Sequence, residues 1–402
     1  MWLQNQIDTA YSRKSTRTHL QIKEGEPLKD GWVVSEVLGN GRMSRVWEAT
    51  RGQQIAAIKI FRRGSSEMES YVNEMRILGA LASNGNCVNI VMPLDTFVVV
   101  SIVDSYKPRI HPCIVFERLE WNLFDAIYEG SVDEELAHKF TRDLFAGLSF
   151  LHAAGIIHTD ISTGNLLLRD NPPSLMIADF GSSLLLTDQI ESHRIGTQAY
   201  WSPEIILKKD YGTPTDIWSA FAVVYEMFTA AVLFDLEDEF DVKYGFPEET
   251  SNTTDTTDDL AKLTDDVSKM DLDEGSSQSN HSNTATTSDE SSSGGDDPDY
   301  SQKHLRMILK LIGPPSSAEF VGGCEHFTIT DTADTADTTT VTFTGEAVGA
   351  RTTFADLLKN NFKFSANSAH SLGEFLEFGL RFSPVDRPAA CDVVKRLGDS
   401  KK

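Results

Sequence analysis

Two short polar motifs constrain this chain more than any other feature of its sequence. The first is Ile156-Ile157-His158-Thr159-Asp160-Ile161-Ser162-Thr163-Gly164-Asn165, and the second, Asp179-Phe180-Gly181, begins fourteen residues after Asn165. Each Asp or Asn alone is compatible with a loop cap. Their joint spacing instead indicates a catalytic carboxylate, Asp160, with two oxygen ligands for a hard cation such as Mg²⁺, Asn165 and Asp179.

The periodicity of apolar residues divides the chain into two parts. Between Gly31 and Ile60, short apolar runs separated by glycine turns indicate strands. Val132–Ala154 has apolar residues at helical spacing, and helical periodicity returns after Thr213, at Phe354–Leu358 and at Leu372–Leu380. This order predicts an α+β protein of two lobes, with a small β-rich lobe followed by a larger helical lobe.

A polar segment at residues 245–300 interrupts the second part. Between Glu248 and Asp299 there are fifteen Asp and Glu and two Lys, a net charge of −13 out of −24 for the whole chain. Such a composition cannot bury enough apolar surface to offset its ordering entropy, so we expect a disordered acidic spacer. The polar residues 1–18 are predicted to form a disordered tail. The Thr-rich stretch Thr328–Thr344 is predicted to be either a long loop or a hairpin.

Charge, cysteine content and hydropathy narrow the class of protein. The chain has 36 Lys and Arg against 60 Asp and Glu, so basic proteins are more plausible partners than nucleic acid. Cys87, Cys113, Cys324 and Cys391 form no CxxC motif and are predicted to be buried apolar residues in a reducing compartment. No apolar run reaches the length of a membrane span and no secretory signal is recognised, so an intracellular, soluble protein is expected.

A glycine-rich turn followed by a lysine indicates a phosphate site. In Leu38–Val46, with the sequence Leu-Gly-Asn-Gly-Arg-Met-Ser-Arg-Val, glycines would let backbone amides approach phosphates closely. Lys59, thirteen residues after Val46, would reach the α- and β-phosphates. Glu74, on a helix predicted over Glu67–Leu81, is the carboxylate expected to hold Lys59.

The polar motifs then acquire chemical roles. Asp160 would accept or orient the proton of a substrate hydroxyl, while Asn165 and Asp179 would bind Mg²⁺. His158 is interpreted as a core histidine, because Asp160 already fills the role of base. Further along, Arg387 is predicted to pair with Glu204 of Ser202-Pro203-Glu204 in a buried, structural ion pair.

Together these motifs resemble the eukaryotic protein kinases, and within them the CMGC group, most closely the SR-protein kinases. The resemblance runs from about His19 to Leu397. Its more specific marks are serine for the third glycine of the turn, threonine in His158-Thr159-Asp160, and the run His304–Pro314, which is similar to the helix that leads into the CMGC insert. It implies an N-lobe at 19–117, a C-lobe at 118–397 interrupted by the spacer, and a tail at 398–402.

The resemblance implies ATP and Mg²⁺ as cofactors and assigns roles to particular residues. The catalytic set is Asp160, Lys59 and Glu74, and the metal ligands are Asn165 and Asp179. The adenine would lie between Val46, Ala57 and Leu167, with Phe116 as gatekeeper and Glu117 to Leu119 as hinge. The full set expected to contact ATP is Leu38, Gly39, Asn40, Gly41, Ser44, Val46, Ala57, Lys59, Phe116, Glu117, Leu119 and Leu167.

The resemblance also implies an activity. It is the ATP-dependent phosphorylation of serines in basic, Arg/Ser-rich proteins, by a monomer that moves between cytoplasm and nucleus and binds neither membrane nor nucleic acid directly. The acidic residues Asp235, Glu237, Asp238, Glu239 and Asp241 would form a docking surface for such substrates, or are simply a solvated face.

Three residues differ from those that most protein kinases or the CMGC kinases carry at the same positions. Ser162 replaces the lysine that neutralises the transferring phosphoryl group, which is expected to cost about 3 kcal/mol, or roughly 10²-fold in rate. Trp201 replaces the arginine that CMGC kinases carry there, which shapes the pocket for the residue after the phosphoacceptor, so a substrate preference different from that family's is expected. Thr159 replaces the arginine that receives activating phosphate, so we expect activity without activating phosphorylation. The alternatives are a weakly active or inactive ATP-binding scaffold that holds basic partners, and an interaction protein that binds no ATP.

Overall fold

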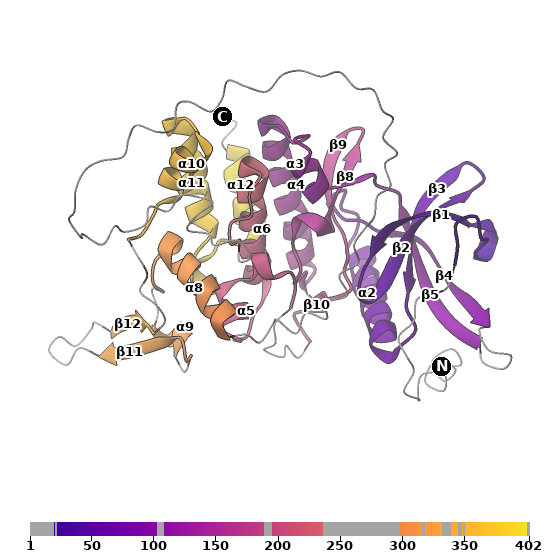
Figure 1. Ribbon diagram of the computed structural model, residues 1–402, viewed down its shortest axis with the longest axis horizontal. Coiled ribbons are helices and arrows are strands. Elements are labelled where there is room, and N and C mark those ends of the chain that lie inside the picture. The colour runs from indigo at the N-terminus through magenta and orange to yellow at the C-terminus, as the bar shows by residue number, and fades with distance from the viewer. Residues whose placement is uncertain are drawn as a thin grey trace, which may run out of the picture.

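The computed structural model describes two lobes. The described residues are 20, 22–102, 108–188, 195–235, 298–315, 318–322, 324–331, 339–344, 348 and 350–399. A sheet-rich lobe lies to the right in Figure 1 and a larger helical lobe to the left, which confirms the predicted α+β architecture. The predicted tail 1–18 and the spacer up to residue 297 lie outside the described residues. The last three residues assigned to the spacer, 298–300, begin helix α8.

The smaller lobe is built on an antiparallel sheet with the strand order β1-β2-β3-β5-β4. Its strands are β1 (Val33–Asn40), β2 (Ser44–Arg51), β3 (Gln54–Phe61), β4 (Pro93–Ile102) and β5 (Pro108–Glu117). The register pairs Val46 with Lys59 and Ala57 with Phe116. Since residues two apart on a strand share a face, Val46, Ala57 and Lys59 lie on one side of the sheet, where the sequence predicted the nucleotide.

Helix α2 (Ser65–Ser83) connects the two lobes and extends the helix predicted over Glu67–Leu81 at both ends. Its apolar residues Ile77, Leu78 and Leu81 are buried in the core of the larger lobe, while Glu74, which is 1% exposed, is buried against the strand that carries Lys59. The helix therefore sets the position of a carboxylate relative to both lobes.

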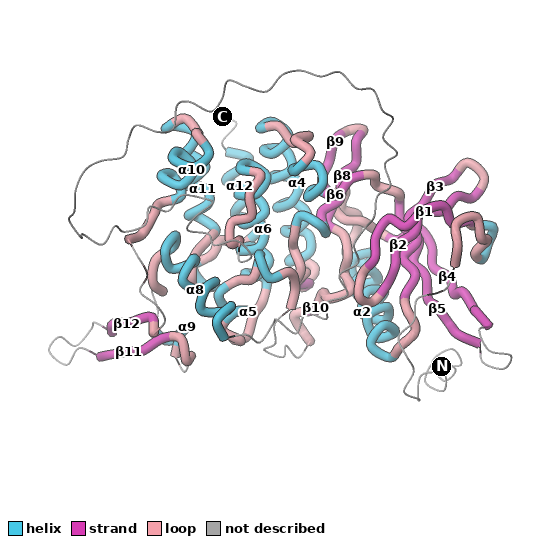
Figure 2. The backbone as a smooth tube through the Cα atoms, in the orientation of Figure 1, coloured by secondary structure: helices cyan, strands magenta, loops and turns pink. Residues whose placement is uncertain are grey.

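Helices stacked around α6 (Thr213–Thr229) make the core of the larger lobe (Figures 1 and 2). α6 is apolar on nearly all sides, and Trp218 at its first turns is fully buried against Phe234, with ring centroids 5.7 Å apart. The remaining helices are α3 (Leu123–Tyr128), α4 (Glu134–Ala153), α5 (Pro203–Ile206), α8 (Pro298–Ile312), α9 (Ala318–Val321), α10 (Phe354–Phe362), α11 (Ala366–Gly379) and α12 (Ala390–Asp399).

Short strands beneath the smaller lobe bring the two polar motifs together. β8 (Leu166–Asp170) and β9 (Pro173–Ile177) form a hairpin whose register pairs Leu166 with Ile177, so Asn165 and Asp179 lie at the same end. β6 (Trp121–Asn122) completes this sheet. β7 (Ile156–Ile157) pairs with β10 (Leu184–Leu185), which fixes the chain before Asp160 and after Asp179. Two motifs that are distant in sequence thereby meet in space.

Two peripheral predictions have a clear outcome. Of the two structures considered for Thr328–Thr344, the strand pair is present, formed by β11 (Phe327–Asp331) and β12 (Thr339–Phe343). The prediction of buried cysteines is right for Cys113 and wrong for Cys391, which is exposed; Cys87 and Cys324 are half-buried. The reason is that α12 is amphipathic: Ala390 and Val393 face the core, and Cys391 faces outward.

No helix within the described ranges is long and apolar enough to span a membrane.

Candidate active site

The ammonium group of Lys59 joins two carboxylates from different lobes. Its Nζ lies 2.8 and 3.0 Å from the carboxylate oxygens of Glu74 and 2.9 Å from Oδ1 of Asp179. Burial lowers the pKa of Lys59, but Asp179 and Glu74 outweigh this and hold the pKa above its ordinary value. Lys59 likewise lowers the pKa of Asp179, while burial raises that of Glu74 more than Lys59 lowers it. Lys59 and Asp179 are therefore charged at neutral pH.

Asp216, at the start of α6, anchors the first polar motif, residues 156–165, which is called the catalytic loop below. Its carboxylate accepts hydrogen bonds from the backbone amides of His158 (2.8 Å) and Thr159 (2.9 Å), and its Oδ2 lies 2.9 Å from Nε2 of His152. Asp216 is 1% exposed. The sequence analysis gave Asp216 no role, and a carboxylate at the start of the helical segment after Thr213 is the one signal of it.

His158 lies in the core, as predicted. Its side chain is fully buried, with Nε2 3.0 Å from the carbonyl oxygen of Ala178 and the ring packed edge-on against Phe180 at 5.3 Å between centroids. The histidine thus links the two polar motifs through packing and one hydrogen bond, and it leaves the carboxylate of Asp160 as the base facing the cleft.

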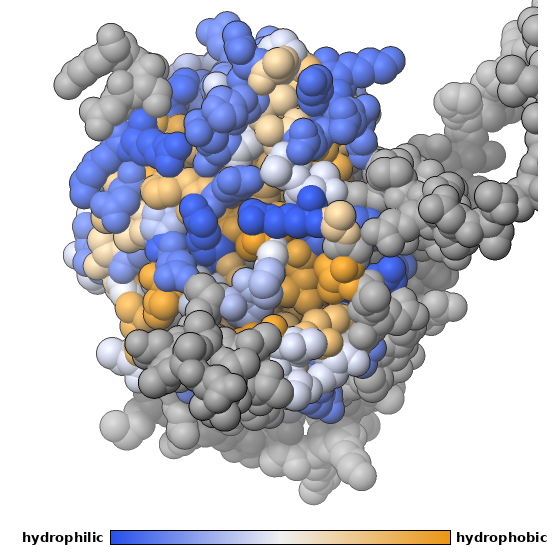
Figure 3. Space-filling model, turned by 90° about the vertical axis from the view of Figure 1, so that its left-hand side faces the viewer, coloured by the Kyte–Doolittle hydropathy of each residue, from blue (hydrophilic) through white to orange (hydrophobic). Residues whose placement is uncertain are grey.

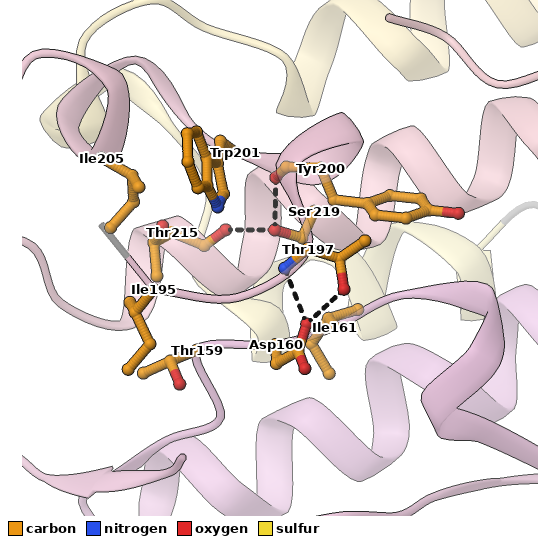
Figure 4. Close-up of a pocket in the computed structure, with 10 residues that line it drawn as sticks. All are labelled: Thr159, Asp160, Ile161, Ile195, Thr197, Tyr200, Trp201, Ile205, Thr215 and Ser219. Atoms are coloured by element: carbon orange, nitrogen blue, oxygen red, sulfur yellow. Dashed lines mark hydrogen bonds between the residues drawn. The ribbon is translucent and has the colours of Figure 1, made fainter. Parts of the chain in front are cut away.

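Hydrogen bonds from two sides orient the carboxylate of Asp160. Oδ1 accepts from the backbone amide of Thr197 (2.9 Å) and from its hydroxyl (2.7 Å), as Figure 4 shows, and Oδ2 accepts from the side-chain amide of Asn165 (2.9 Å). Because the Asn165 nitrogen is used in this way, its amide oxygen is the atom that could bind a metal. Thr197 was missed by the sequence reasoning; it lies 37 residues from Asp160, and no local pattern marks it.

Thr159 ties the catalytic loop to the segment that follows Asp179-Phe180-Gly181. It has a left-handed backbone conformation (φ 71°), and its hydroxyl donates to the carbonyl oxygen of Ser182 at 3.0 Å. From the other side, the side-chain amide of Asn73 on α2 donates to the carbonyl oxygens of Gly181 (3.3 Å) and Ser183 (2.8 Å). These neutral contacts hold the start of this segment to the catalytic loop and to α2, and further along the guanidinium of Arg76 on α2 pairs with Asp188 at 2.6 Å.

The predicted nucleotide residues line one cavity of about 480 Å³ between the lobes. Glu74, Asn165 and Asp179 line it too, as do Glu120 and Asp125, which the sequence reasoning had not singled out. All twelve residues expected to contact ATP line this cavity: Leu38, Gly39, Asn40, Gly41, Ser44, Val46, Ala57, Lys59, Phe116, Glu117, Leu119 and Leu167.

The inner wall of this cavity is apolar. Phe116, Leu119 and Leu167 pack on Val91, Met176 and Ala178 in a small cluster between the lobes. An apolar slot with a charged far end matches the chemistry of a nucleotide, whose base is flat and weakly polar and whose phosphates are anionic.

A second cavity, of about 980 Å³, opens in front of the first and shares Gly41, Ser44, Lys59 and Asp179 with it. Asp160, Thr197 and Trp201 line this front cavity. The catalytic carboxylate therefore lies where a group from the nucleotide cavity and a second molecule can meet.

The loop around Trp201 is packed tightly. The Trp201 indole donates to the carbonyl oxygen of Gly196 at 3.1 Å. Gly196 has φ 84°, and a Cβ there would lie 2.4 Å from the carbonyl oxygen of Thr159. A pocket of only about 10 Å³ remains under this loop, enough for no more than one water.

The residues fit a magnesium site completed by a nucleotide. Within the described ranges no group of three or more His, Cys, Asp or Glu could hold a metal alone. Asn165 and Asp179 supply one amide and one carboxylate oxygen in the nucleotide cavity. Mg²⁺ is commonly held by one or two protein oxygens together with substrate phosphates and water.

Ser162 is buried, 5% exposed, and its carbonyl oxygen accepts from the backbone amide of Asn165 at 3.0 Å. Its short neutral side chain brings no positive charge to the site, in agreement with the departure noted in the sequence.

The predicted ion pair between Glu204 and Arg387 is present. Two guanidinium nitrogens of Arg387 lie 2.6 and 2.7 Å from the two carboxylate oxygens of Glu204, and both side chains are fully buried. Arg387 also donates to the carbonyl oxygens of Pro214, Phe382 and Arg381. The bidentate geometry fixes the end of the loop that carries Trp201.

Comparison with known proteins finds relatives with kinase activities in their names. The chain is 32% identical over 200 residues to a probable serine/threonine-protein kinase of Encephalitozoon cuniculi, covering 49% of this chain and 36% of that protein. It is 29% identical over 253 residues to the serine/threonine-protein kinase pim-2 of Danio rerio (58% and 79%). It is 30% identical over 217 residues to the human dual specificity tyrosine-phosphorylation-regulated kinase 3 (52% and 35%).

The match therefore spans only about a third of the length of the first and third of these relatives. The names also cover more than one kind of kinase, so they do not single out a subgroup. The family model described as the protein kinase domain matches residues 32–293, well over half of the chain. The chain belongs to the protein kinase domain family.

Proposed function

We propose that this chain is an ATP-dependent serine/threonine protein kinase that phosphorylates basic, Arg/Ser-rich proteins. The observation that carries the proposal is the bridge from Lys59 to both Glu74 and Asp179, made beside an oriented Asp160. In phosphoryl transfer the lysine–glutamate pair and the metal-binding aspartate must be in place together. All of these groups are assembled here.

The arrangement explains how the chain's own residues would act. The hydroxyl oxygen of the acceptor would bond to the γ-phosphorus of ATP as the bond from that phosphorus to the bridging oxygen breaks. Asp160, oriented by Thr197 and Asn165, would take the hydroxyl proton. Mg²⁺ held by Asn165 and Asp179 would neutralise phosphate charge when bound.

Two features support a basic, serine-containing substrate. The chain is strongly acidic, with a net charge of −24, which favours encounter with cationic partners. The motifs resemble those of SR-protein kinases. Of the acidic residues expected to form the docking surface, Asp235 is described and the others, from 237 to 241, lie outside the described residues. On the same resemblance we propose that the protein occurs in cytoplasm and nucleus, which imaging of a tagged chain would test.

Thr159 supports activity without activating phosphorylation. An arginine at this position would need a phosphate to hold the following segment, whereas the Thr159 hydroxyl bonds Ser182 directly. Phosphatase treatment is expected to leave the transfer rate unchanged. Loss of activity after that treatment would refute this part of the proposal.

The deciding experiment is transfer of radiolabelled phosphate from Mg-ATP to an Arg-Ser repeat peptide, with casein as a generic acceptor. We expect labelling of the repeat peptide that disappears in Asp179→Ala. Labelling of casein alone would reject Arg/Ser-rich proteins as the substrate class but would still support protein kinase activity. No labelling of either acceptor, in a preparation that binds Mg-ATP, would reject the enzyme.

Ser162 favours a second candidate, a nucleotide-binding scaffold that holds basic partners through its acidic surface. Such a protein would bind Mg-ATP, measured as a thermal shift, and show no transfer that depends on Asp160. An interaction protein without nucleotide binding would show no thermal shift.

A further inference from the structure

The region where a phosphoryl group would be transferred lacks the cation that Ser162 replaces. Among the described residues, three cations line the two cavities: Lys59, Arg118 and Arg42. Only a cation that lines the cavity containing Asp160 could reach a γ-phosphoryl group beside that carboxylate.

Two of these cations are already engaged. Lys59 is held by Glu74 and Asp179, at the end of the nucleotide cavity where the α- and β-phosphates would lie. Arg118 lies at the hinge, where its Nε donates to Glu48 at 2.9 Å and its guanidinium also bonds the carbonyl oxygen of Leu119. Arg118 lines the nucleotide cavity but not the front cavity that contains Asp160.

Arg42 differs from both in position and in pairing. It lies in the turn between β1 and β2 and lines the front cavity together with Asp160 and Asp179. Its side chain is exposed, and it makes no hydrogen bond or ion pair with any residue that the structure describes. An exposed arginine retains its full charge and suffers little desolvation, so it is free to bind an anion.

The backbone under Arg42 is held in place. The amide of Gly41 donates to the carbonyl oxygen of Ser44 at 2.9 Å, which closes the turn. Just after β3, the guanidinium of Arg62 donates to the carbonyl oxygen of Gly41 at 2.7 Å, and the Arg62 amide donates to the carbonyl oxygen of Met43 at 2.9 Å. These bonds flank residue 42 on both sides and keep the turn over the cleft.

We propose that Arg42 supplies the positive charge on the transferring γ-phosphoryl group that the Ser162 position lacks. The proposal deepens the proposed kinase function and rests on it. As the acceptor oxygen bonds to the γ-phosphorus and the bond to the ADP oxygen breaks, the guanidinium donates hydrogen bonds to non-bridging phosphoryl oxygens, and the acceptor proton passes to Asp160. A guanidinium suits this role because its planar donors match phosphate oxygens in pairs.

The test measures recognition of a transferring phosphoryl group without any protein acceptor. The quantity is the ratio of the Kd for Mg-ADP to the Kd for Mg-ADP with aluminium fluoride, which mimics that group. Arg42→Ala is expected to lower this ratio about tenfold and to leave the Kd for Mg-ADP unchanged. Arg42→Lys should recover part of the ratio.

Arg45→Ala is the matched control. Arg45 belongs to the same hairpin and its loss changes the net charge equally, but its side chain bonds Asn40 and lies over Trp47, and it lines neither cavity. Its ratio should equal that of the unmodified protein. An unchanged ratio in Arg42→Ala, an equal fall in Arg45→Ala, or no tightening by aluminium fluoride in the unmodified protein would overturn the proposal.

A charge-relocation experiment makes the assignment specific. Ser162→Lys, introduced together with Arg42→Ala, should restore the ratio, because it returns a cation to the position where Ser162 replaces lysine. Failure of this rescue, while Ser162→Lys alone raises the ratio, would mean that Arg42 acts elsewhere. Because none of these measurements needs phosphate transfer, a failure to phosphorylate any acceptor, which would refute the proposed function, is distinguished from a failure of Arg42 to bind the phosphoryl analogue, which would refute this inference alone.

Discussion

The two ends of the cleft are built from different chemistry. At the nucleotide end, charges are matched in pairs: Lys59 with Glu74 and Asp179, Arg118 with Glu48, and Arg169 with Glu117. At the transfer end, the part of the cleft around Asp160, neutral donors position the side chains instead: the Thr197 hydroxyl orients Asp160, and the Thr159 hydroxyl bonds the carbonyl oxygen of Ser182. The charged end is thus suited to the nucleotide that we propose the chain binds, a ligand common to many enzymes, whereas neutral contacts orient the side chains at the transfer end.

The largest effect is expected at the charged end. Lys59→Met should lower kcat for phosphate transfer about 10³-fold, because it removes a preorganised cation and leaves Glu74 buried without its partner. Steady-state kinetics would measure this. Lys29→Met, which removes an exposed lysine on the same lobe, serves as the control. Retention of a tenth of the activity in Lys59→Met would show that the charge pairs are dispensable.

The anchor of the catalytic loop comes next. In the unmodified protein the backbone amides of His158 and Thr159 bond separate carboxylate oxygens of Asp216. Asp216→Asn leaves a single oxygen for both amides. The free energy of unfolding should fall by about 2 kcal/mol, the range for hydrogen bonds to a charged group. Denaturation in urea would measure it, with the exposed Asp392→Asn as control. Equal stability of the two variants would contradict this anchoring.

A smaller effect tests whether neutral contacts at the transfer end matter for rate. Thr197→Val removes the 2.7 Å hydroxyl bond to Asp160 and retains the amide bond. We expect kcat to fall about tenfold, the loss of roughly one hydrogen bond to a charged group, with the KM for ATP unchanged. A change in KM alone would place Thr197 in nucleotide binding.

The smallest effect concerns pH. Glu226 is fully buried, and its carboxylate accepts from Tyr200 at 2.6 Å and from Tyr128 at 3.3 Å. Burial raises the pKa of Glu226 above 4.5 despite these hydroxyls, so the folded protein binds the proton more tightly than the unfolded chain.

This stabilisation is complete below pH 4.5 and is lost as pH rises through the folded pKa. The glutamine in Glu226→Gln cannot ionise. As pH rises above 4.5, the free energy of unfolding of this variant should therefore fall by about 1 kcal/mol less than that of the unmodified protein. Thermal unfolding of both proteins across this range would measure it. Parallel pH profiles would show that Glu226 titrates normally.

The same contrast explains what the sequence could predict. Lys59, Glu74 and Asp179 lie in motifs whose spacing indicates phosphate chemistry, and the two-lobed fold follows from periodicity. Thr197 and Asp216 were not predicted, because their contacts form only when the helices pack. Thr197 bonds a residue 37 positions away, and Asp216 bonds two residues 57 and 58 positions away. Cys391 was mispredicted because residue type alone does not say which face of an amphipathic helix it occupies.

The ion pair between Glu204 and Arg387 also has a consequence for biosynthesis. Its partners are 183 residues apart, so a chain emerging from the ribosome carries its complete set of catalytic side chains long before Arg387 is added. Until then Glu204 has no cation, and the loop around Trp201 lacks its anchor. The loop around Trp201 therefore gains this anchor only after Arg387 has been synthesised, well after the catalytic side chains themselves.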